Sequence, residues 1–180
     1  FTDASRTLFA EGRVLDRHGY TFADLDNDGD LDLAIASGGE DGVGAGAPNL
    51  FLRNEMQSGV LHFVEKQVSA EMAEPAARSR SLIPIASVDG KAIDLYFTAL
   101  LRQEFPNTLF RNDRRVDEFQ FVPESGFLTM AINDHGRGVI TDFDGDGNSD
   151  YLVVQDWKLK LYWHPDSGRG VSTFSYRVPK

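Results

Sequence analysis

Carboxylate side chains crowd into two short segments of this chain of 180 residues. The segments "DLDNDGDLD" at 24–32 and "DFDGDGNSD" at 142–150 share the pattern D-x-D-x-D-G-x-x-D. Neighbouring carboxylates repel one another, by roughly 1 kcal/mol per close pair even in water. Calcium takes about six to eight oxygen ligands from carboxylates and backbone carbonyls, and glycine at the sixth position permits a tight turn around the ion. The pattern therefore predicts two calcium loops.

The candidate ligands occupy equivalent positions in the two loops. In the first loop they are the carboxylates of Asp24, Asp26, Asp28 and Asp32 and the backbone carbonyl of Asp30. In the second loop they are the carboxylates of Asp142, Asp144, Asp146 and Asp150 and the backbone carbonyl of Asn148. We expect the side chain of Asp30 to point to solvent.

The acidic segments allow three other interpretations. An EF-hand needs a bidentate glutamate at the twelfth position, where this chain has Ile35 and Val153 in expected strands. Magnesium is disfavoured because it keeps several waters rather than entering an all-protein cage. A solvated acidic turn without an ion stays open, although two such runs in register within a repeat weaken it.

The acidic segments belong to a longer internal repeat. "NLFLRN" at 49–54 matches "NTLFRN" at 107–112, and "LKLYWH" at 159–164 is a weaker third copy. A phenylalanine opens a short extended segment nine or ten residues after each of these, at Phe63, Phe121 and Phe174. Self-similarity at long spacing is typical of repeat architectures.

This repeat predicts three units, at about 18–68, 80–124 and 136–178, within one segment covering 1–180. "FTDA" at the start matches the phenylalanine-led segment, so residues 1–5 are expected to be the outer strand of a preceding unit. Alternation in "LAIAS" and "LFL" favours strands, and only 66–78 could form a short helix. The expected fold is all-β, with propeller blades of four antiparallel strands. Propellers use about four to eight blades, so three units are expected to be part of a larger propeller.

These motifs resemble those of FG-GAP repeats, also called VCBS-type repeats, which occur in integrin α-subunit propellers and in secreted bacterial proteins. The resemblance is carried by "DLDNDGDLDLAIAS", "DFDGDGNSDYLVV", "NLFLRN", "NTLFRN" and the literal "GAP" at 46–48. It implies a β-propeller in which a calcium loop links the first two strands of a blade. It implies no reaction.

The middle unit departs from this pattern. Aligning "VDGKAIDLYF" places Asp89, Gly90 and Asp94 near motif positions, with one extra residue between Gly90 and Asp94. The first two ligands are replaced by apolar residues such as Ile85 and Ala86. We therefore expect no ion in this unit.

Composition excludes several classes of function. A net charge of −10 argues against nucleic acid as a partner, and no apolar run is long enough for a membrane-spanning helix. Without cysteine the chain has no disulfide, zinc-thiolate site or cysteine nucleophile. The chain begins at Phe1 without a targeting peptide, so we expect a mature product, a trimmed chain or a fragment.

The expected function is a calcium-stabilised binding or scaffold module outside the cell, whether secreted, periplasmic or at the cell surface. Its partners would be a protein or carbohydrate ligand and further propeller blades from the same or another chain. The alternative is part of a secreted polysaccharide-active enzyme. The sequence favours a role without catalysis, because the four histidines lack a metal-ligand spacing: His18, His62, His135 and His164.

Aromatic residues near the end of the chain offer one further candidate surface. Trp157, Tyr162 and Trp163 could stack on a sugar or bury against a partner. The interpretation we favour is packing between blades.

Overall fold

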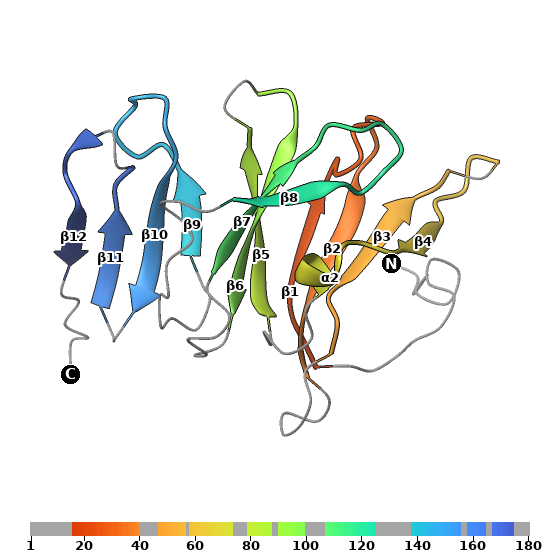
Figure 1. The fold of residues 1–180 in the computed structure, drawn as a ribbon, viewed down its shortest axis with the longest axis horizontal. Coiled ribbons are helices and arrows are strands. Elements are labelled where there is room, and N and C mark those ends of the chain that lie inside the picture. The colour runs from red at the N-terminus through yellow and green to blue at the C-terminus, as the bar shows by residue number, and fades with distance from the viewer. Residues whose placement is uncertain are drawn as a thin grey trace.

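The computed structural model describes residues 16–39, 47–56, 58–73, 79–87, 90–99, 107–124, 138–155, 158–164 and 167–174. Within these ranges the chain is all-β, with three four-stranded antiparallel sheets and one short helix (Figure 1). The first sheet contains β1 (Asp16–Ala23), β2 (Asp32–Gly39), β3 (Leu50–Asn54) and β4 (Phe63–Lys66). The middle sheet contains β5 (Ser79–Ala86), β6 (Ile93–Ala99), β7 (Thr108–Asn112) and β8 (Phe121–Glu124). The third sheet contains β9 (Gly138–Thr141), β10 (Asp150–Gln155), β11 (Lys158–Tyr162) and β12 (Val171–Phe174).

Each sheet is a meander in which every strand pairs with the next one along the chain. The prediction of four antiparallel strands per unit is confirmed. The helix α2 (Ala70–Ala73) covers only a small part of the segment where a short helix was considered. No helix in the described ranges is long and apolar enough to cross a membrane.

The three sheets pack against one another in chain order. Each has a leading face, which bears Leu33, Ile35 and Leu52 in the first sheet, Leu95, Phe97 and Phe110 in the middle sheet, and Tyr151, Val153 and Tyr162 in the third. The opposite, trailing face bears Ala34, Ala36 and Phe51 in the first sheet and Tyr96, Leu109 and Ile85 in the middle sheet.

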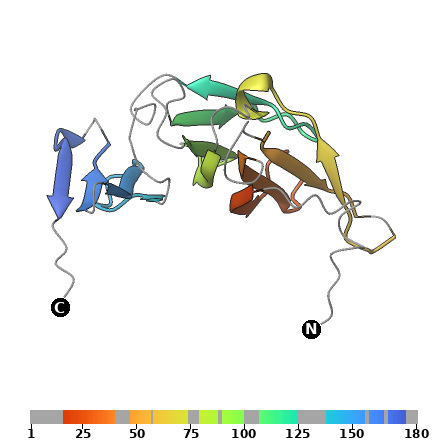
Figure 2. The ribbon, with the colours of Figure 1, turned by 90° about the horizontal axis from the view of Figure 1, so that it is seen from below.

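The same packing mode occurs twice. The trailing face of the first sheet forms one core with the leading face of the middle sheet, where the rings of Phe51 and Phe97 lie 6.2 Å apart. The trailing face of the middle sheet packs in turn on the leading face of the third, where Tyr96 and Tyr151 are 5.1 Å apart. Figure 2 shows the sheets following one another along an open arc, and the described residues form no closed ring.

Strand pairing sets the length of the loop between the first two strands of each sheet. The last pairs before the loop are Ala23 with Asp32, Ala86 with Ile93, and Thr141 with Asp150. The two acidic loops, 24–31 and 142–149, therefore span eight residues each, and the middle loop, 87–92, spans six. The extra residue between Gly90 and Asp94 is present in the sequence, and the shorter loop arises because Ala86 and Ile93 still pair.

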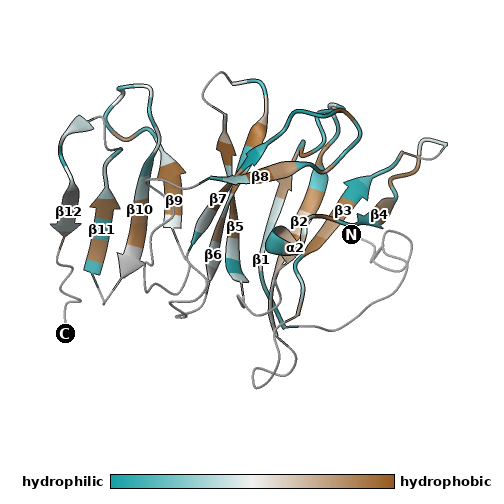
Figure 3. Cartoon of the chain, viewed as in Figure 1, coloured by the Kyte–Doolittle hydropathy of each residue, from teal (hydrophilic) through white to brown (hydrophobic). Residues whose placement is uncertain are grey.

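All three loops lie at the same end of the sheets, the upper end in Figure 1. Figure 3 shows the contrast in hydropathy, with the hydrophobic residues mostly in the strands and the two acidic loops largely hydrophilic. Because short paired strands hold both ends of each loop, the loop side chains are presented together at that end.

Candidate metal centres

The two acidic loops are anchored in the same way at their last aspartate. Asp32 accepts hydrogen bonds from the backbone N–H of Leu25 at 2.9 Å and of Asn54 at 3.0 Å. Asp150 accepts the equivalent two bonds at 3.0 and 2.8 Å. This buried aspartate thus joins the start of the loop to the end of β3 in the first sheet, and to His164, just beyond the end of β11, in the third.

The first aspartate of each loop closes the turn. Gly29 donates its N–H to Asp24 at 3.1 Å, and Gly147 donates to Asp142 at 2.9 Å. The two glycines have φ of 96° and 90°, a left-handed conformation that side chains with Cβ adopt only at a cost. The glycine at the sixth position therefore has the backbone role that the motif predicts.

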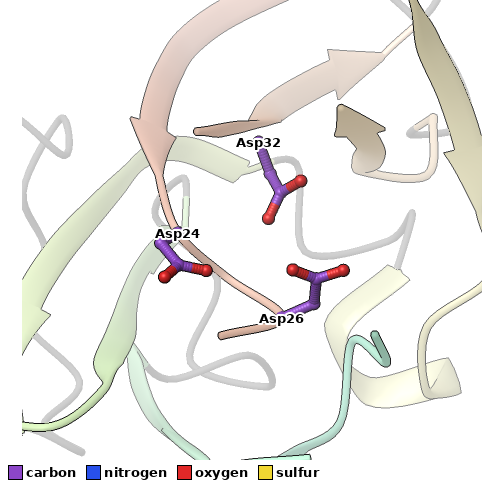
Figure 4. Close-up of side chains that lie close together, drawn as sticks. All are labelled: Asp24, Asp26 and Asp32. Atoms are coloured by element: carbon purple, nitrogen blue, oxygen red, sulfur yellow. The ribbon is translucent and has the colours of Figure 1, made fainter. Parts of the chain in front are cut away.

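The first loop brings three carboxylates together. Asp24, Asp26 and Asp32 each place one oxygen within 4.8 Å of the others, and their carboxyl groups lie around a common space (Figure 4). Asp26 is fully buried, and neither of its oxygens has a hydrogen-bond partner, nor does Oδ1 of Asp24. Buried polar atoms are normally paired, and a cation among these carboxylates would satisfy the unpaired oxygens.

Burial and charge raise the proton affinity of this group. Burial, followed by the charges of Asp32 and Asp28, raises the pKa of Asp26 to about 6. Burial also raises the pKa of Asp32. A bound divalent cation would reverse both effects, because it favours the ionised carboxylates.

One arginine lies beside the first centre. Nε of Arg53 is 2.9 Å from Oδ2 of Asp26, without the alignment of a hydrogen bond. Its Nη2 binds Oδ2 of Asp28 at 3.2 Å and also contacts Asp117 in the connection between β7 and β8. Asp26, Asp28 and Asp117 form a second close group of acids around this guanidinium.

The placement of Asp28 and Asp30 qualifies the predicted ligand set. Asp28 approaches Asp26 but pairs with Arg53 and with the N–H of Asp30, so it lies outside the group formed by Asp24, Asp26 and Asp32. The side chain of Asp30 is exposed, as expected. Sequence reasoning missed Arg53, although its position next to Asn54 in "LFLRN" was part of the recognised repeat.

The second acidic loop is more open than the first. Asp142, Asp144 and Asp146 place one oxygen each within 4.8 Å of the others, and Asp142 and Asp146 are exposed. The backbone N–H of Gly147 and then of other loop residues hold the pKa of Asp142 below its usual value. Asn148 lies in the same loop and Asp150 begins β10, and both are outside this close group.

The third sheet also has an arginine beside its acidic loop. Arg169 contacts Asp144 at 2.9 Å, and its guanidinium lies 4.8 Å from the ring centre of Trp163. The indole Nε1 of Trp163 donates to Ser172 at 2.8 Å. Tyr162 stacks on Tyr151 in the core, which agrees with the packing role we favoured for it, while Trp157 lies outside the described residues.

In the middle sheet, the aspartate equivalent to Asp32 is Asp94, and it pairs with a guanidinium. Asp94 accepts the N–H of Asn112 at 2.8 Å, as Asp32 does from the equivalent residue. Its other oxygen accepts from Nη1 of Arg111 at 2.7 Å. Asp89 lies outside the described residues. The positive partner of the buried Asp94 is therefore a side chain of the same sheet.

Histidine contributes to none of the close acidic groups found in the described ranges, which consist of aspartates alone. His18 lies 3.0 Å from Asp16 on β1. His62 lies before β4 and His164 after β11, while His135 is not among the described residues.

Neither a protein-family model nor a curated protein sequence matches this chain. The class of protein therefore follows from the fold and site: an all-β protein built from repeated four-stranded antiparallel sheets, with an aspartate-rich loop between the first two strands of two of them.

Proposed function

We propose that this chain is a calcium-stabilised β-propeller module of the FG-GAP or VCBS kind, which provides a binding or scaffold surface outside the cell. The observation that carries the proposal is the first centre, where the fully buried Asp26 places one oxygen within 4.8 Å of oxygens of Asp24 and Asp32. Oxygen-only ligands on a short glycine-containing loop are the chemistry that calcium prefers.

Calcium at this position would stabilise the folded chain in two ways. It would offset the repulsion among the aspartates, and it would fix the turn between β1 and β2, which ties the first sheet together. Because the unfolded chain does not hold the carboxylates in place, binding free energy adds to folding free energy. A ligand at 100 times its dissociation constant contributes about 2.7 kcal/mol.

The propeller assignment draws its support from the repeated packing mode. Leading face meets trailing face twice, with hydrophobic clusters at both seams. A third repetition in the same direction would add a blade to the arc, and enough additions would close a ring. Millimolar calcium outside cells would fill loops of modest affinity, which favours an exported location.

A thermal melt of the metal-stripped protein tests this function. Calcium should raise the melting temperature, whereas magnesium and sodium chloride at equal ionic strength should raise it much less. The variant Asp24→Asn should lose most of the shift that the first loop contributes. The matched control is Asp30→Asn in the same loop, whose side chain is exposed and whose backbone carbonyl is kept.

The proposal fails if the melting temperature of the parent protein is the same in excess calcium as in chelator. It also fails if Asp24→Asn and Asp30→Asn respond to calcium alike. Either result would mean that the aspartates form a solvated turn with no bound ion.

A further inference from the structure

The leading face of the first sheet is apolar, and none of the other described sheets packs on it. Its central side chains Leu33, Leu52 and Phe63 are only 5–8% exposed within a cluster that includes Ile35 and Leu61, and the exposed part of the face lies on β1. Tyr20 on β1 is 75% exposed, whereas Leu82, which has the same register position in the middle sheet, is 3% exposed. Phe22 is also exposed, next to Tyr20 and Phe63.

A buried polar atom at the edge of this face lacks a partner. In the seam between the first and middle sheets, Asn112 donates to the carbonyl of Leu25 at 3.0 Å and accepts from Asn27 at 3.1 Å, both in the acidic loop. Asn54 has the same position in the first sheet, since its N–H binds Asp32 as that of Asn112 binds Asp94. Its Oδ1 is buried without a hydrogen bond.

The third sheet presents the complementary surface. Its trailing face carries Val139, which is 54% exposed, whereas Thr21 at the same register position in the first sheet is 6% exposed against the middle sheet. Its acidic loop is largely exposed and forms no contact like that of Asn112 with the first loop in the described part of the chain.

We infer that this chain docks head to tail on a second copy of itself. The leading face of the first sheet receives the trailing face of the third sheet of the other copy, and Asn54 meets the acidic loop 142–149. This contact would repeat, in the same direction, the face-to-face packing between the first and middle sheets and between the middle and third sheets. It deepens the proposed function by naming a partner, and it depends on the packing mode rather than on the metal. Because the two surfaces differ, the contact is heterologous, so copies form a ring if the rotation closes and an open chain if it does not.

Sedimentation over a concentration series tests the contact, in calcium and in chelator at about 0.15 M salt, where repulsion between the negatively charged copies is screened. The mass should rise above the 20.0 kDa of one chain as concentration increases. Tyr20→Glu and Val139→Glu should each give a single chain at all concentrations. Both side chains are largely exposed, so their melting temperatures should match the parent's.

Mixing these two variants makes the test specific. Each retains one intact surface of the pair, so an equal mixture should form a dimer and nothing larger. Val122→Glu, an exposed position on β8 of the middle sheet, is the matched control and should associate like the parent.

Two results would overturn the inference. One is a parent mass of 20.0 kDa throughout, in both calcium and chelator. The other is association of Val139→Glu equal to that of the parent, which would indicate a contact between two identical faces. A monomer whose melt still responds to calcium would refute docking and leave the proposed function standing. A head-to-tail assembly whose melting temperature does not respond to calcium would support docking and refute the proposed function.

Discussion

Replacing Asp26 with asparagine should stabilise the metal-free protein while removing its response to calcium at the first loop. Burial raises the pKa of this carboxyl from 3.8 to about 6. Below pH 3.8 the folded and unfolded chains both carry the proton, and no penalty exists. Between pH 3.8 and about 6 the unfolded chain ionises first, so stability is lost over that interval. At about 1.4 kcal/mol per pH unit, the loss reaches about 3 kcal/mol at neutral pH.

Asparagine has no charge to bury, so it avoids this penalty. The attraction of Arg53, whose Nε lies 2.9 Å from Oδ2 of Asp26, opposes the penalty and is already included in the raised pKa. The expected gain for the metal-free variant is therefore about 1–3 kcal/mol, which for a chain of this length raises the melting temperature by about 3–10 °C. In calcium the order should reverse, because the parent gains binding energy that the variant lacks.

Urea unfolding of both proteins at pH 7.4, in chelator and in calcium, measures the four free energies that this prediction needs. Asp30→Asn is again the control, since it removes one negative charge from the same loop at an exposed position. The reasoning is refuted if Asp26→Asn is less stable than the parent in chelator. It is refuted equally if calcium stabilises both proteins to the same extent.

Four further predictions concern the loops and their neighbours. Calcium affinity at the first loop should fall by up to about tenfold per pH unit below pH 6, because binding must displace the proton of Asp26; calorimetric titrations from pH 5 to 7.5 would show a flat profile if this is wrong. Arg111→Met should cost about 2–3 kcal/mol in urea unfolding whether or not calcium is present, since the buried Asp94 loses its partner, and a loss seen only in chelator would contradict this. Gly29→Ala should cost about 1–2 kcal/mol because of its φ of 96°, as its added Cβ would meet nothing within 4 Å; urea unfolding with no measurable loss would disprove the strain. Asn112→Ala should weaken calcium binding about tenfold at the first loop and leave the second unchanged, so equal titration curves at both loops would rule out its positioning role.

Local features of the fold could be predicted because short sequence patterns encode them. Alternation in "LAIAS" and "LFL" places alternate side chains on opposite faces, and the structure has β2 and β3 there. The glycine at the sixth loop position is needed for positive φ, and Gly29 and Gly147 both have it. The turn chemistry of the two acidic loops was therefore readable residue by residue.

Features that depend on contacts between sheets could not be read in this way. Arg53 contacts Asp117, which lies 64 residues further along the chain, and no pattern in either local segment predicts this contact. The shorter middle loop could not be predicted either, because it depends on strand pairing. Ala86 pairs with Ile93, so β5 continues one residue beyond the position at which β1 and β9 end.

Counting bound calcium by equilibrium dialysis of the metal-stripped chain tests the central claim most directly. The account predicts two ions per chain, falling to one in Asp24→Asn and remaining at two in Asp30→Asn. No bound calcium at millimolar free concentration, with the same fold by circular dichroism, would contradict it.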